Sequence, residues 1–136
     1  MPDQLSWQVW LAVGGGSAVG GLLRFGIGRW LDGRTTAGIP LATWLVNVVG
    51  SAVLCWLTVR HQRIPLDPRL QFGLTSGLLG GFTTYSAFNG ELVRKLQEGL
   101  WFEAGLYLAA TVGSALSHHF GRGVVWKARA YAGGQA

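Results

Sequence analysis

The most distinctive part of this sequence is GLLGGFTTYSAF, residues Gly77–Phe88, inside the third of four apolar runs. Paired glycines followed by paired threonines form helices poorly, because glycine loses the most backbone entropy and threonine is stiff at χ1. A helix broken in a membrane leaves carbonyl and amide groups without partners, which is tolerated only inside protein or beside a watery cavity. Broken helices of this kind bind ions in transporters and channels. We expect a break here, with a continuous glycine-rich helix as the alternative.

The composition around this stretch is that of a membrane protein. Of 136 residues, 49% are hydrophobic and 12% are charged, against about 25% charged in an ordinary soluble domain. Four runs with few charges are long enough to cross about 30 Å of hydrocarbon as helices. The sequence predicts one all-α transmembrane domain over residues 1–136, with four helices that span about 5–29, 39–60, 70–95 and 101–122. We interpret the first run as a retained helix, because Asp3 and not a basic cluster precedes it.

The charged residues indicate a lipid partner and give little bias in orientation. The net charge is +5, but the basic residues end apolar runs and form no stripe with interleaved aromatics, so we expect contact with the lipid bilayer and no nucleic acid. Four spans put both termini on one side, and Lys and Arg number six on that side and four on the other. The first group is Arg60, Arg63, Arg69, Arg122, Lys127 and Arg129, and the second is Arg29, Arg34, Arg94 and Lys95. So weak a bias favours a chain that inserts both ways and pairs with an inverted copy.

Two predicted helices carry polar rows in apolar surroundings. The rows are Thr43, Asn47 and Ser51 in the second span, and Tyr107, Thr111, Ser114 and His118 in the fourth. Hydrogen bonds between helices are one explanation, worth about 0.6 kcal/mol each. Neutral donors along a pore are the other, because a small anion loses its water there and a lysine or arginine would bind it too well. For Asn47, the two explanations stay equally open.

The residues leave three classes of function: a passive channel, a proton-coupled small exporter and a non-transporting membrane scaffold. Coupled transport generally requires an ionisable residue at mid-membrane. The four uncharged runs contain only His118 and His119, both late, while Glu91 and Glu103 lie at span ends. This distribution favours passive flow. We do not expect an enzyme, because no set of nucleophile, base and orienting group can be assembled.

Four motifs resemble the Fluc/CrcB family of small fluoride channels, and the resemblance covers nearly the whole chain. They are GGLLRF at residues 20–25, PLAT at 40–43, NVVG at 47–50 and, most specifically, GGFTTYSAF at 80–88. The resemblance implies an antiparallel, dual-topology homodimer with two fluoride pathways in the plasma (inner) membrane. Paired inverted heterodimers also belong to this family. The implied activity is passive export of fluoride from the cytoplasm, which confers fluoride resistance.

The resemblance also implies roles for individual residues. Asn47 and Ser86 would donate hydrogen bonds to fluoride, and Tyr85 and Phe88 would offer the positive edges of their rings. The main-chain carbonyls of Gly80 and Thr83 would hold a structural Na⁺ at the dimer centre, as suits a hard cation. We add to the pathway the neutral donors of the polar rows, which are Thr43, Tyr107, Thr111 and Ser114. Arg24 ends a span, and either shapes the potential of a vestibule or snorkels to the interface.

This chain departs from the family at two positions of its main motif. Tyr85 stands where the family usually has phenylalanine, and Ala87 stands where it usually has threonine. One ring edge therefore gains a hydroxyl group, and one hydroxyl group is lost. His118 and His119 are not part of the family motif, and a histidine pair near a span end is typical of an interface position.

Overall fold

The computed structural model describes residues 6–133, apart from the side chains of Gln62, His118, His119 and residues 121–133. Its elements are α1 (Trp7–Trp30), β1 (Thr35–Thr36), β2 (Ile39–Pro40), α2 (Leu41–Arg63), α3 (Pro68–Phe72), the π-helix η2 (Gly73–Leu79), α4 (Gly80–Phe82), α5 (Tyr85–Gln97) and α6 (Trp101–Gly133). The chain is thus mostly helical, as predicted.

Two helices of the described residues meet the length and composition needed to cross a membrane. They are α1, with mean hydropathy 1.3, and residues Leu41–His61 of α2, with mean hydropathy 1.7. The third predicted span consists of four short elements, α3 to α5. The fourth helix, α6, continues past the predicted end at residue 122 to Gly133, because residues 123–133 contain no proline and several good helix formers.

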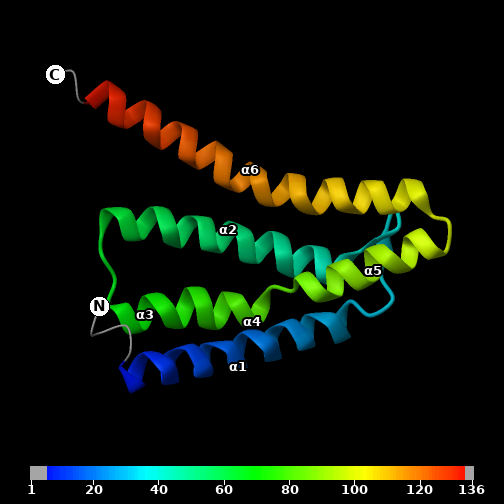
Figure 1. Ribbon diagram of the computed structural model, residues 1–136, viewed down its shortest axis with the longest axis horizontal. Coiled ribbons are helices and arrows are strands. Elements are labelled where there is room, and N and C mark those ends of the chain that lie inside the picture. Colours follow the sequence, from blue (N-terminus) through cyan, green and yellow to red (C-terminus); the bar gives the residue numbers. More distant parts are fainter. Residues whose placement is uncertain (1–5, 134–136) are drawn as a thin grey trace.

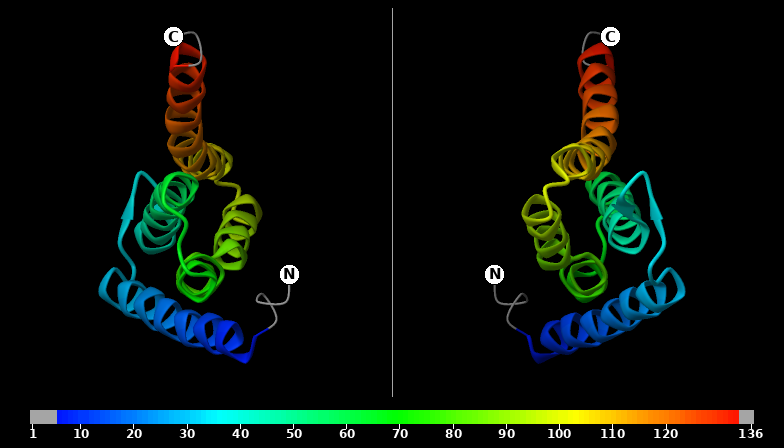
Figure 2. Two further views of the ribbon diagram at one scale, coloured as in Figure 1. Left: turned by 90° about the vertical axis from the view of Figure 1, so that its left-hand side faces the viewer. Right: turned by 90° about the vertical axis from the view of Figure 1, so that its right-hand side faces the viewer.

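The helices lie roughly side by side in layers. In Figure 1 the order across the molecule is α6, α2, the segment from α3 to α5, and α1. The end-on views show α1 and α6 on opposite outer sides, with α2 and the α3–α5 segment between them (Figure 2). The hairpin between α1 and α2 lies at the same end of the molecule as the turn between α5 and α6 (Figure 1).

A small antiparallel hairpin, which the all-α prediction did not include, joins α1 to α2. Thr35 pairs with Pro40, and Thr36 pairs with Ile39. The two turn residues between them, Ala37 and Gly38, have φ angles of 51° and 76°, as a two-residue hairpin turn with two left-handed positions requires. The hairpin is too short to alter the fold class.

Glycines bring α1 and the third segment into backbone contact. A Cβ atom at Gly16 would collide with the Gly73 carbonyl oxygen, and one at Gly20 would collide with the Leu78 carbonyl oxygen. From the other side, a Cβ at Gly77 would lie 2.8 Å from the Val13 carbonyl oxygen. Small residues let membrane helices approach this closely, so the GxxxG spacing of Gly16 and Gly20 positions the broken segment against α1.

Local capping groups set the ends of the short elements. Asp67 accepts a hydrogen bond from the Arg69 N–H at 2.9 Å and Pro68 follows it, which begins α3. At the end of α5, the Leu100 N–H donates to the Lys95 carbonyl and the Gly99 N–H to the Leu96 carbonyl. Together with the φ of 78° at Gly99, this is a Schellman turn. It folds α6 back along α5.

Candidate functional site

The third segment is broken at its centre, where the sequence predicts a break. Thr83 and Thr84 both have extended backbone angles between α4 and α5. The side-chain amide of Asn47 on α2 forms two hydrogen bonds with the backbone at this point. Its Oδ1 accepts from the Thr84 N–H at 2.8 Å, and its Nδ2 donates to the Thr84 carbonyl at 3.0 Å. Asn47 therefore replaces helix hydrogen bonds that the break removes.

At the break, two backbone N–H groups bond side chains and not the carbonyls of Gly80 and Thr83. The Thr84 N–H, four residues after Gly80, donates to Asn47. The Ala87 N–H, four residues after Thr83, donates to the Thr84 hydroxyl at 3.3 Å. In an α-helix these amides would donate to the carbonyls of Gly80 and Thr83. The Gly80 and Thr83 carbonyl oxygens therefore lack the amide donors that a continuous helix would give them.

Arg24 contacts the same break from α1. Its Nε donates to the Gly81 carbonyl at 3.1 Å. It also lines a cavity of about 350 Å³ together with the hydroxyl-bearing Thr43 and Thr84. Two arginines and one aspartate, Arg24, Arg29 and Asp32, are the charged residues of this lining, so the cavity has a net positive wall. A cavity of this sign attracts anions.

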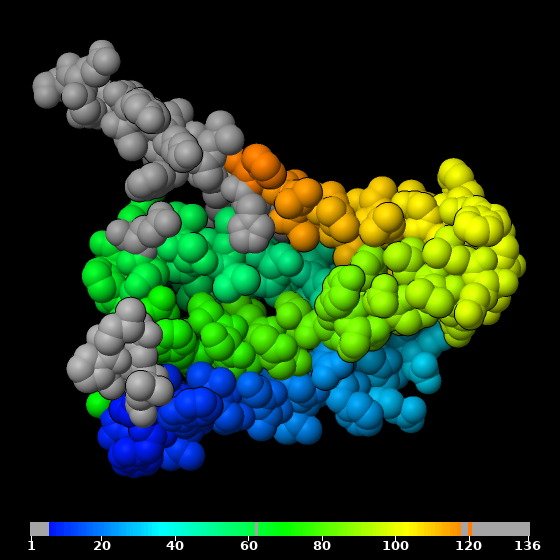
Figure 3. Space-filling view, in the orientation of Figure 1, coloured from blue at the N-terminus to red at the C-terminus, as the bar shows by residue number. Residues whose placement is uncertain are grey.

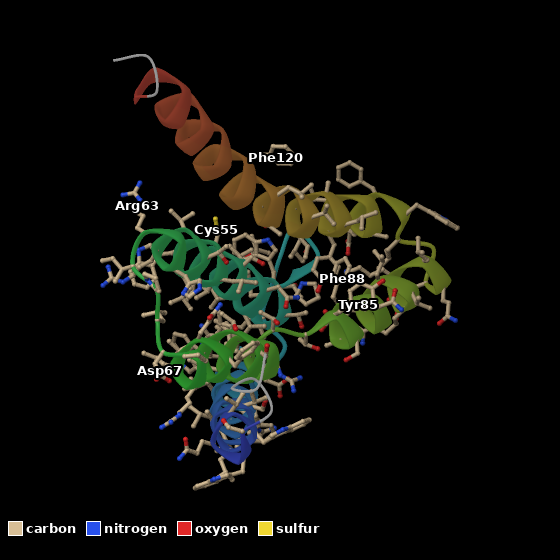
Figure 4. All side chains as sticks on the ribbon, turned by 60° about the vertical axis from the view of Figure 1, so that its left-hand side comes forward. Cys55, Arg63, Asp67, Tyr85, Phe88 and Phe120 are labelled. Carbon is tan, nitrogen blue, oxygen red and sulfur yellow. The ribbon has the colours of Figure 1, made fainter. Side chains whose placement is uncertain are left out.

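Three aromatic rings form a row from the break toward α6. The ring centroids of Tyr85 and Phe88 are 6.2 Å apart, and those of Phe88 and Tyr107 are 5.0 Å apart in an edge-to-face arrangement. Phe88 and Tyr107 are 6% and 0% exposed, whereas Tyr85 is 77% exposed. Figure 4 shows Tyr85 and Phe88 on the first part of α5. The row thus runs from a surface position to Tyr107, which is fully buried among the described residues.

Glu91 joins the two predicted polar rows and was missed as a site residue by sequence reasoning. Its Oε1 accepts from the Thr43 hydroxyl at 2.9 Å, and its Oε2 accepts from the Tyr107 hydroxyl at 2.6 Å. The second distance is short, as is usual for a hydroxyl that donates to a carboxylate. Glu91 had been placed at a span end. Its spacing of three residues from Phe88 puts both on one face of α5, which is the signal that could have identified it.

The remaining predicted residues differ in their surroundings. The Ser86 hydroxyl lies 3.3 Å from the Thr84 hydroxyl. The buried Thr111 hydroxyl has no hydrogen-bond partner within the described part of the chain, which is unusual for a buried polar group. The Ser114 hydroxyl donates to the Ala110 and Thr111 carbonyls of its own helix. His118 and His119 lie outside the described side chains.

The arrangement can bind an anion without a strong cationic trap at its centre. Hydroxyl groups, an amide and ring edges surround the break and the aromatic row, while Arg24 lies at the adjoining cavity. Among the described residues, no cluster of three or more His, Cys, Asp or Glu side chains could hold a metal ion. The oxygen atoms at the break are main-chain carbonyls, the hydroxyls of Thr83, Thr84 and Ser86, and the amide oxygen of Asn47.

Comparisons with known proteins show the family of this chain. Residues 11–121 match the family described as CrcB-like protein, Camphor Resistance (CrcB). A fluoride-specific ion channel FluC of Thiobacillus denitrificans is 46% identical over 100 residues, which cover 71% of this chain and 77% of the relative. FluC 2 of Geobacillus kaustophilus is 36% identical over 106 residues, 77% of this chain and 82% of the relative. FluC of Roseiflexus sp. is 34% identical over 116 residues, 84% of this chain and 94% of the relative.

Proposed function

The chain belongs to the CrcB-like protein family, and we propose from this premise how it works as a fluoride-specific ion channel. Fluoride leaves the cytoplasm passively, down its electrochemical gradient. Hydrogen fluoride crosses membranes as a neutral weak acid and dissociates inside, so a passive anion path is enough for export when the interior is negative. The observation that carries this proposal is the broken third segment, clamped by Asn47 beside a row of neutral donors and ring edges.

Neutral hydrogen-bond donors let an anion pass without trapping it. An asparagine amide has two N–H groups, and one of those on Asn47 donates to Thr84, so the second can donate to fluoride. The unpartnered hydroxyl of Thr111 is a further donor. Ring edges of Phe88 and Tyr107 supply weak positive potential between them. Each replaces part of the water shell, and none binds as strongly as an ammonium group would.

The hydroxyls of Thr43 and Tyr107 can bind fluoride only in some orientations. Both donate to Glu91, so each becomes a donor to fluoride only when it turns away from that carboxylate. Glu91 therefore competes with the ion for two donors of the path. The competition keeps binding weak enough for release, which conduction requires.

Two antiparallel copies form the channel. On α1, a Cβ atom added at Gly14, Gly21 or Gly28 would meet no other atom within 4 Å, and these positions share one helical face at intervals of seven residues. A small-residue face on a membrane-spanning helix is available for close approach of a second copy. The weak charge bias of the sequence supports opposite orientations of the two copies in the inner membrane.

The Gly80 and Thr83 carbonyls would hold a structural Na⁺ between the two copies, two from each copy, because their helical amide donors are diverted. Such an ion would supply positive charge to the broken segments and the nearby anion path.

Glu91 favours one alternative, a proton-coupled exporter. It is an ionisable group that contacts Thr43 on α2 and Tyr107 on α6, and ionisable groups inside membrane proteins often relay protons. Under this alternative, each fluoride that leaves would bring a proton in.

The test is fluoride release from liposomes that contain the purified protein. A fluoride electrode records efflux after a potassium ionophore removes the opposing voltage, and chloride-loaded liposomes serve as the control. We expect fast fluoride release that depends on the ionophore, with little chloride release. Proton uptake in step with fluoride release and independent of the ionophore would support the exporter, and no release above empty liposomes would support a scaffold.

A further inference from the structure

A buried ammonium group lies on α5, the helix that carries Glu91, and forms a salt bridge with an acid of α6. The Lys95 side chain on α5 is only 8% exposed, and its Nζ donates to Glu103 Oε2 at 2.9 Å. Glu103 is 36% exposed and belongs to the first turn of α6, where the helix dipole favours a carboxylate. Buried lysines are rare without such a partner.

The corner of the fold holds Glu103 in place. The Schellman turn at Gly99 brings α6 back against α5, and Figure 3 shows the yellow α5–α6 corner as one packed end of the molecule. The tip of the β1–β2 hairpin covers the acid, because a Cβ atom at Gly38 would collide with the Glu103 carboxylate. Glu103 is thus confined between Lys95 and the backbone of the hairpin.

Glu91 is a second acid within reach of Lys95. The two residues are four positions apart on α5, about 6 Å along the helix axis, and glutamate four residues before lysine is the favourable order for an ion pair. The flexible lysine stem allows the ammonium to reach either acid. In this structure the ammonium binds Glu103, and Glu91 is occupied by the hydroxyls of Thr43 and Tyr107.

We propose that Glu103 is a positioning residue of the fluoride pathway, which restrains the Lys95 ammonium and keeps it off Glu91. This inference rests on the proposed function. Without Glu103, the buried ammonium would have no counter-charge and would turn to Glu91 one helical turn away. A salt bridge there would displace the hydroxyls of Thr43 and Tyr107 and place a positive charge beside the aromatic row. Fluoride would then bind too strongly to leave quickly.

The two partners are unequal because Lys95 is buried and Glu103 is partly exposed. A purely structural salt bridge would lower the unfolding midpoint of its variants and leave the flux per folded dimer unchanged. We expect Glu103→Gln to lower fluoride flux per folded dimer roughly tenfold, because it frees a buried charge. Lys95→Met should conduct at close to the wild-type rate, since it removes that charge and leaves a partly exposed carboxylate. In Lys95→Met/Glu103→Gln, flux should return to the level of Lys95→Met alone.

The experiment measures liposome flux for these chains, with the thermal unfolding midpoint of each recorded alongside. Gly38→Ala is a second variant that keeps both charges but displaces the Glu103 carboxylate, and it should lower flux only when Lys95 is present. It tests the inference even if Glu103→Gln does not fold. Equal losses in both single variants, or no recovery in the double variant, would overturn the inference. A wild-type chain that does not conduct would instead refute the proposed function.

Discussion

At the scale of single residues, the site depends on side chains that replace missing backbone hydrogen bonds. Asn47 bonds both the N–H and the carbonyl of Thr84, and Arg24 bonds the Gly81 carbonyl. Thr84 caps α5 through the Ala87 N–H. Each of these groups forms a hydrogen bond at or next to the break and has a polar atom beside the proposed path of the ion. We therefore expect their substitution to affect stability and conduction together.

Asn47→Ala should abolish fluoride flux while the dimer remains. The change leaves the buried Thr84 N–H and carbonyl without their partners, at an expected cost of about 1–3 kcal/mol in the free energy of unfolding. Liposome efflux and the oligomeric state in detergent are the measurements. Thr58→Ala is the matched control, because the Thr58 hydroxyl donates only to the Leu54 carbonyl of its own helix. Normal conduction by Asn47→Ala would remove Asn47 from the pathway.

Tyr85→Phe should conduct at close to the wild-type rate, since the ring next to Phe88 is kept and only its hydroxyl is lost. Phe88→Ala should stop conduction, because it interrupts the ring row between Tyr85 and Tyr107. Fluoride efflux of both variants, measured under identical conditions, checks the pair. Loss of all transport in Tyr85→Phe would mean that the hydroxyl of this chain has become essential.

At the scale of elements, close packing against α1 positions the broken segment. Gly16 and Gly20 face the backbone of η2, and Gly77 faces α1 from the other side. The segment itself changes from π-helix to α-helix before it breaks. Such a segment has few hydrogen bonds of regular helix to stabilise it, so contact with a straight neighbouring helix supplies its rigidity.

Gly16→Ala should weaken this contact by about 1–3 kcal/mol, because its new methyl group would collide with the Gly73 carbonyl. Gly15→Ala is the adjacent control, where an added Cβ meets no other atom within 4 Å. The thermal unfolding midpoint and the yield of monodisperse protein distinguish the two variants. Equal midpoints would contradict the packing role of Gly16.

Removal of sodium should lower fluoride flux if the released carbonyls of Gly80 and Thr83 hold this ion. The measurement compares liposomes prepared with Na⁺ and with a large organic cation that cannot enter a carbonyl cage. Flux should recover when Na⁺ is restored. An unchanged rate after exhaustive removal of Na⁺ would argue against a sodium requirement.

At the scale of the whole molecule, large apolar side chains remain exposed in the single chain. Trp7, Trp10 and Trp30 of α1 and Trp101 and Phe102 of α6 are between 66% and 82% exposed. A soluble monomer rarely leaves patches of this size open. Under the proposed function, lipid and a second copy of the chain cover this surface.

Dual topology can be tested with a single introduced cysteine. Cys55 is replaced by alanine, and Leu100→Cys in the α5–α6 turn is labelled from outside the cell with a reagent that cannot cross membranes. About half of the protein should react if both orientations are equally populated. Ile64→Cys, after α2, is the paired control and should also react by about half. Full labelling at one site and none at the other would establish a single orientation.

Features that depend on local composition could be predicted from the amino-acid sequence. Runs of apolar residues indicate a membrane protein, and Gly80 to Thr84 cannot continue a helix well, so the break was predictable from propensity. The two polar rows followed from helical periodicity. The hairpin and the full length of α6 could not be predicted in this way. A turn with two left-handed residues has only a weak sequence signal, and α6 has no strong stop signal near residue 122.

The contacts between distant side chains depend on how the helices pack. Glu91 bonds Thr43 across 48 positions of the chain, and Arg24 bonds Gly81 across 57. Lys95 bonds Glu103, which is 8 positions away, although Glu91 is nearer in sequence on its own helix. No local pattern encodes these choices, because they depend on how α1 packs on η2 and α4 and how α2 and α6 pack on α5. Packing geometry, and not residue type, determines which of several possible polar partners a buried group bonds.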